Sequence, residues 1–182
     1  QQGAGRAYAV GARRHDVRAA SGDDDGAATP DAGDRSEFTP PAGYSRLIGR
    51  TWEIPAGANI YKCVRVTVPD DMYIVNFVAQ APIGTHHSVL SIAGANGTAG
   101  PDGEVDCTAT ELGMNMIYAS AVGTAPLELP EGVGVKIPAG TQLHLNLHLF
   151  NAGDDAIRGE SAVWIKTQPT APRAIPAAST IS

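Results

Sequence analysis

The 182-residue chain lacks a long hydrophobic run. A membrane-spanning helix needs about 18 or more consecutive apolar residues, and no such stretch is present. The N-terminus also lacks the apolar segment of a secretion signal, so we expect the mature form if the protein is exported. Basic residues interleaved with aromatic ones, which would indicate a nucleic-acid partner, are missing too, and the formal net charge is −6. The composition therefore argues against a membrane span and against nucleic-acid binding.

Cysteine is scarce, and Cys63 and Cys107 can form at most one intramolecular disulfide. Each lies in or beside an apolar, strand-like stretch. A bridge between them would close a loop of about 44 residues and stabilise the fold by about 4 kcal/mol in the chain-entropy model. It would also indicate an oxidising compartment. The alternative is a pair of buried free thiols.

Large apolar residues are absent from the run 21–37, which cannot bury enough surface to offset the entropy of ordering it. We expect residues 1–37 to be a low-complexity tail or linker that could also act as a partner-binding or self-association arm. Residues 38–168 are predicted to form one folded domain, followed by a Pro- and Ala-rich tail at 169–182. The Ala-, Gly- and Asp-rich N-terminus favours a bacterial protein, and a disulfide would imply that it is secreted, periplasmic or on the cell surface.

Helical periodicity is missing from the folded part, where short β-rich runs alternate with Pro and Gly. The triplet Pro-Ala-Gly recurs at 41–43, 55–57 and 138–140, which predicts turns with Pro at the second position. About eight strands in one domain favour an all-β fold, an antiparallel β-sandwich of jelly-roll type. The predicted strands are Leu47–Ile54, Ile60–Val68, Met72–Ala79, Ser88–Ala93, Met114–Ala119, Gly134–Ile137, Thr141–Phe150 and Ser161–Thr167.

The predicted strand Thr141–Phe150 has the clearest alternation in the sequence. Its leucines occupy one face, which we expect to lie against a core. The opposite face is polar and should look at water or at a site. The residues of this polar face are Gln142, His144, Asn146 and His148.

Four histidines in the folded part are the candidate metal ligands, because clustered imidazoles with few competing ligands are typical of copper or zinc sites. His86 and His87 are adjacent, and adjacent strand residues point to opposite faces, so both can reach one ion only where the backbone is irregular. Gly84 makes such an irregularity plausible. The third ligand would be His148 or His144, which are roughly 13 Å apart along a strand and cannot easily share one ion. The alternative is that these are ordinary exposed or hydrogen-bonded histidines.

A set of residues and motifs occurs in one order along the chain: Tyr61-Lys62-Cys63, the His86-His87 pair, Cys107, the segment 129–134, Leu145-Asn146-Leu147-His148, Asn151 and Gly159. This order resembles the copper type II, ascorbate-dependent monooxygenases. The resemblance covers roughly residues 50–167.

The resemblance implies the first of that family's two β-sandwich domains, which binds an electron-transfer copper through three histidines. By motif, His86, His87 and His148 correspond to these ligands, and Cys63 and Cys107 to one of the disulfides. His144 has no role in the family pattern.

Two departures from the family pattern affect the expected activity. Ser88 stands where the family has methionine, and after Thr167 no second domain with the oxygen-activating copper follows. His144 with Met114 and Met116 offers the right ligand types for a second site, with Asn146 nearby. Two methionines at period two on a strand are alternatively core residues.

Three functions are compatible with the sequence. The first is an exported domain that holds one copper per chain for redox, storage or delivery. The second is a copper- and ascorbate-dependent monooxygenase that catalyses C-hydroxylation with a second copper site or a partner chain. The third is a structural, self-assembling subunit whose tail adds a strand to a neighbour.

Overall fold

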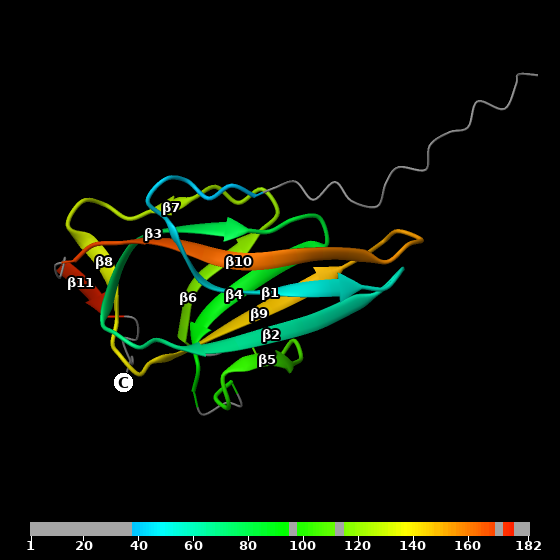
Figure 1. The fold of residues 1–182 in the computed structure, drawn as a ribbon, viewed down its shortest axis with the longest axis horizontal. Coiled ribbons are helices and arrows are strands. Elements are labelled where there is room, and N and C mark those ends of the chain that lie inside the picture. Colours follow the sequence, from blue (N-terminus) through cyan, green and yellow to red (C-terminus); the bar gives the residue numbers. More distant parts are fainter. Residues whose placement is uncertain (1–37, 95–97, 112–114, 170–172, 177–182) are drawn as a thin grey trace, which may run out of the picture. The chain divides into compact units, whose positions relative to one another are not determined.

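The polypeptide folds as two packed β-sheets in the computed structural model, which describes residues 38–94, 98–111, 115–169 and 173–176 (Figure 1). These residues contain eleven strands and no helix. The all-β sandwich is confirmed, and each of the eight predicted strands has a counterpart. The strands are β1 (Ser45–Ile54), β2 (Asn59–Thr67), β3 (Met72–Gln80), β4 (Thr85–Ile92), β5 (Gly103–Asp106), β6 (Asn115–Ala121), β7 (Leu127–Glu128), β8 (Val133–Ile137), β9 (Gln142–Phe150), β10 (Ile157–Thr167) and β11 (Arg173–Pro176).

The two sheets differ in size and in strand order. The six-stranded sheet has the order β1-β10-β3-β8-β11, with β7 pairing with β3. The five-stranded sheet has the order β5-β2-β9-β4-β6, so β9 is its central strand. Strand pairs are antiparallel except β11 and β8, which are parallel. The jelly-roll connectivity stays a prediction.

The core lies between the sheets and is built on the leucine face of β9. Leu143, Leu145, Leu147 and Leu149 are each 0% exposed, which confirms the predicted alternation. Apolar residues from the other sheet pack in the same core cluster, among them Ile48, Trp52 and Ile54 of β1, Ile74 and Phe77 of β3, and Val163 and Ile165 of β10. Since β9 is held in place from this side, its polar face looks outward from the sandwich.

The Pro-Ala-Gly triplets form turns, but the predicted position of proline is wrong by one residue. The amide of Ala58 donates to the carbonyl of Pro55, so proline is the first residue of the turn. Gly57 is then the third residue and has a φ of 64°, which a type II turn requires at that position.

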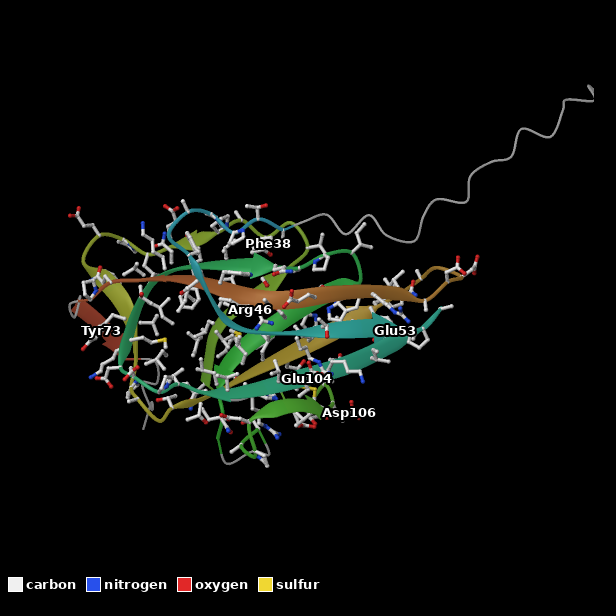
Figure 2. All side chains as sticks on the ribbon, viewed as in Figure 1. Phe38, Arg46, Glu53, Tyr73, Glu104 and Asp106 are labelled. Atoms are coloured by element: carbon white, nitrogen blue, oxygen red, sulfur yellow. A yellow bond between two sulfur atoms is a disulfide. The ribbon has the colours of Figure 1, made fainter. Side chains whose placement is uncertain are left out.

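Charged pairs reinforce the sheets and their edges. Arg50 of β1 is buried and donates to the carbonyls of Cys63 and Val105, at 2.7 and 3.1 Å, while its other nitrogen pairs with Glu104 at 2.8 Å. These bonds link the edge strand of one sheet to β2 and β5 of the other. Glu104 and Asp106, both of β5, are labelled in Figure 2.

Of the two predicted tails, the structure describes residues 169 and 173–176 of the C-terminal one. The predicted N-terminal tail, residues 1–37, lies outside them. Residues 173–176, within the predicted C-terminal tail, form β11 and pair with β8. The domain boundaries stay a prediction.

Candidate metal centre

The His86–His87 pair lies at an irregular start of β4. The register with β9 shifts between Thr85 and His87, so His86 is the extra residue of a β-bulge. The preceding Gly84 has a φ of 102°, a conformation that glycine adopts without a steric penalty. A Cβ there would lie 2.9 Å from Cη2 of Trp52. The irregularity expected from the sequence is therefore present, and it lets two adjacent imidazoles face one point.

A chain of buried hydrogen bonds fixes the start of β4 to the opposite sheet. Oγ1 of Thr85 lies 2.7 Å from Oγ of Ser161 on β10. Nε1 of Trp52 on β1 donates to the same Oγ at 2.8 Å. Sequence reasoning gave these three residues no role, because nothing local indicates that they converge. They hold the backbone that precedes the histidine pair.

The imidazoles of His86, His87 and His148 converge through the same ring atom. Nδ1 of His86 lies 3.0 Å from Nδ1 of His87 and 3.1 Å from Nδ1 of His148, and Nδ1 of His87 lies 3.3 Å from that of His148. A point equidistant from the three is about 1.8 Å from each in their plane, so an ion at the roughly 2.0–2.1 Å typical of metal–imidazole bonds would lie slightly to one side. These separations fit one metal ion with an open further position.

The site is partly open to solvent, and the pKa values of two of its three histidines are lowered. His86 is exposed, whereas His87 and His148 are half-buried. Burial lowers the pKa of His87, and the neighbouring His86 lowers it further. Burial also lowers the pKa of His148, followed by the charges of His87 and His86. Since neutral imidazole is the form that binds a metal, these shifts keep His87 and His148 able to bind at a lower pH than an ordinary histidine.

Two residues of β2 hold the ring of His148. The register pairs Tyr61 with His148, and the two rings stack with centroids 4.5 Å apart and planes 4° apart. Oδ1 of Asn59 lies 2.6 Å from Nε2 of His148. Sequence reasoning missed Asn59. It lies two residues before Tyr61, so the alternation of a strand places the two side chains on the same face. Tyr61 was noticed only as part of a motif.

The predicted disulfide is present, with the Cα atoms of Cys63 and Cys107 5.8 Å apart. It ties β2 to the segment that follows β5. That segment covers part of the polar face of β9, because Nδ2 of Asn146 donates to the carbonyls of Thr108 at 3.1 Å and Glu111 at 3.4 Å. Asn146 is thus fully buried and anchors this segment.

His144 lies on the same face of β9 but is enclosed. It is 0% exposed, and neither ring nitrogen has a hydrogen-bond partner among the described residues. Burial lowers its pKa, the positive charge of Arg65 lowers it further, and Glu111 opposes the shift. Neighbours across the strands are Arg65 on β2 and Ser91 on β4.

The residues of the predicted second site lie on two strands, with His144 and Asn146 on β9 and Met116 on β6. In the described part of the chain, His86, His87 and His148 form the one cluster of three or more His, Cys, Asp or Glu side chains that could hold a metal, and His144 is not among them. Met116 lies on β6 and is 60% exposed, so it is not a core residue. Met114 lies outside the described residues. A second site stays a prediction.

The fold and the site define a β-sandwich with a three-histidine geometry suited to a metal ion. Over 87 residues the chain is 33% identical to peptidyl-glycine alpha-amidating monooxygenase A of Xenopus laevis and 32% identical to monooxygenase B of the same species. The matched segment is 46% of this chain but only 9% and 10% of those proteins. No family model matches the chain. The comparisons therefore support a monooxygenase-like relationship over less than half of the chain.

The described residues contain no helix long and apolar enough to cross a membrane. The disulfide is compatible with an extracellular protein, because such bonds persist in oxidising compartments.

Proposed function

We propose that the chain is an exported copper-binding domain that holds one copper ion through Nδ1 of His86, His87 and His148. The convergence of these three atoms at 3.0 to 3.3 Å is the observation that carries the proposal. The ion would serve redox, storage or delivery. The disulfide supports export, since it suits an oxidising compartment.

Copper is favoured over other metals by the ligand type and by the relatives. Imidazole suits both copper and zinc, and the affinity of nitrogen sites for divalent ions is greatest for Cu²⁺. The resemblance of the histidine pair and the late-strand histidine to copper monooxygenases points the same way. Exposed carboxylates, which calcium or magnesium would need, are absent from the ligand cluster.

The chain's own residues account for how such a site would be prepared. Copper held by imidazoles can cycle between Cu(I) and Cu(II), which supplies one-electron transfer. The bulge at His86 aligns two ligands, and β9 supplies the third from the neighbouring strand. Partial burial lowers the pKa of His87 and of His148, which favours the neutral rings whose Nδ1 atoms would bind the ion.

Copper stoichiometry tests the proposal. Purified protein is loaded with copper, freed of loosely bound ion on a desalting column, and analysed for copper per chain by mass spectrometry. We expect about one copper per chain in wild type and almost none in His148→Ala, because two imidazoles bind far less tightly than three.

His144→Gln is the matched control, since His144 lies on the same strand and face but outside the cluster. It should retain copper, and thermal melting should show that both variants are folded. Wild type that binds no copper after loading, or takes zinc instead from an equimolar mixture, would contradict the proposal.

A monooxygenase is the second candidate, supported by the identity to proteins named as peptidyl-glycine alpha-amidating monooxygenases. The matched segment is about a tenth of those proteins, and the family resemblance implies that this activity would need a second copper site or a partner chain. The test is oxygen uptake by copper-loaded protein with ascorbate and a peptide that ends in glycine. Uptake that needs all three components would favour the enzyme, and its absence would favour the binding domain.

A further inference from the structure

Asn59 lies diagonally across from His148 on the outer face of the five-stranded sheet. The register pairs Asn59 with Phe150 and Tyr61 with His148, and diagonal neighbours in a sheet are within reach of each other's side chains. Oδ1 of Asn59 lies 2.6 Å from Nε2 of His148, the ring nitrogen that faces away from the cluster. We infer that Asn59 is a positioning residue that selects the His148 tautomer able to bind the metal. This inference rests on the proposed copper site.

The tautomer follows from the chemistry of the two groups. A neutral imidazole carries one N–H donor and one acceptor nitrogen, whereas an amide oxygen only accepts. Nε2 of His148 therefore holds the proton and donates it to Asn59. Nδ1 is left with its lone pair, and this is the atom 3.1 and 3.3 Å from Nδ1 of His86 and His87.

His148 differs in this respect from the other two histidines. In the hydrogen bonds between described residues, the rings of His86 and His87 take part only through Nδ1. Stacking on Tyr61 sets the plane of the His148 ring, but an aromatic face leaves the position of the ring proton open. Asn59 supplies the missing restraint.

The amide also sets how strongly His148 donates to the metal. A carboxylate on the remote nitrogen raises ligand basicity, and a neutral amide raises it less. Asn59 thus leaves His148 a weaker donor than an aspartate would, which favours Cu(I) relative to Cu(II). Replacing it by aspartate should stabilise Cu(II) and lower the reduction potential.

The experiment compares wild type, Asn59→Ala and Asn59→Asp. Asn76→Ala is the matched control. Asn76 is also a strand asparagine, on β3 of the other sheet, and its side chain donates a hydrogen bond to the hydroxyl of Tyr44. Nitrogen-15 NMR of the metal-free protein at mildly alkaline pH reports the His148 tautomer. Copper affinity by competition and the reduction potential report the effect on the loaded site.

We expect His148 to be wholly Nε2–H in wild type and Asn59→Asp, and a mixture of tautomers in Asn59→Ala. Asn59→Ala should bind copper about tenfold more weakly, the lower end of the range for such supporting bonds because Asn59 is exposed. Asn59→Asp should bind with unchanged stoichiometry and a lower potential. The control should match wild type in every measurement.

An Nδ1–H or mixed tautomer in wild type would overturn the inference, and so would an Asn59→Ala variant with unchanged tautomer and affinity. Wild type that fails to bind copper would instead defeat the proposed function. The NMR measurement still decides the role of Asn59 in that case, so the two failures are distinguishable.

Discussion

His144 and His148 lie on the same face of one strand, yet their surroundings are opposite. His148 is half-buried, stacks on Tyr61, donates to Asn59 and faces two further imidazoles. His144 is fully buried, and its ring nitrogens have no partner among the described residues. Position on the strand alone therefore does not decide whether a histidine joins the three-histidine cluster. The bulge of β4 brings His86 and His87 beside His148. The segment after β5, which the disulfide holds, covers the end of the face where His144 lies.

Removing the disulfide should have the largest effect on this comparison, because it releases the segment that covers Asn146 and the buried end of the face. The double variant Cys63→Ala/Cys107→Ala should lose about 4 kcal/mol of unfolding free energy, measured by urea denaturation. Copper stoichiometry should be unchanged wherever the variant is folded. A loss below about 1 kcal/mol would show that the bridge contributes little to stability.

Gly84→Ala should disturb the other end, where the bulge aligns His86 and His87. A residue with a side chain at a φ of 102° is strained, and its Cβ would meet Trp52 and Ile157 at 2.9 Å. We expect a loss of about 2–3 kcal/mol in thermal or chemical unfolding, together with weaker copper binding.

Gly123→Ala is the control for strain alone, since Gly123 has a φ of 78° but no atom within 4 Å of the added Cβ. It should cost about 1 kcal/mol and leave copper binding unchanged. Equal effects of the two substitutions on copper affinity would contradict the role given to the bulge.

The pH dependence of stability should show the smallest of these effects. Burial lowers the folded-state pKa of His144, so the unfolded chain binds more protons below pH about 6.5. The stabilising contribution is complete above that pH and is lost as the pH falls toward the folded pKa, by at most about 1.4 kcal/mol per pH unit. Urea unfolding of metal-free His144→Gln between pH 7 and 5 should show a shallower decline than wild type, and an equal slope would count against a buried neutral His144.

Much of the fold could be predicted because its strands have strong alternation. β9 shows this best, because leucine at every second position makes only one of its two faces apolar, and that face must lie against the core. The three strands that were missed, β5, β7 and β11, are short: β7 has two residues, β11 has four, and β5 has four with only Val105 apolar. Such strands form because a neighbouring strand presents an edge, which local sequence does not reveal.

Spacing alone predicted the candidate site only as far as the ligand types, and the family resemblance supplied the choice of His86, His87 and His148 that the structure brings together. The irregularity before His86 followed from two adjacent histidines after a glycine. Choosing between His144 and His148 from spacing required the register of β4 against β9, and a bulge shifts that register by one residue. The face of Asn59 followed from alternation with Tyr61, but its contact with His148 was out of reach because it depends on the pairing of β2 with β9.

X-ray absorption at the copper edge of the Cu(I)-loaded wild-type protein tests the central claim most directly. We expect three imidazole nitrogens at roughly 2.0 Å and no sulfur in the coordination shell. A sulfur ligand, or scattering from fewer than three imidazoles, would contradict a copper site formed by His86, His87 and His148.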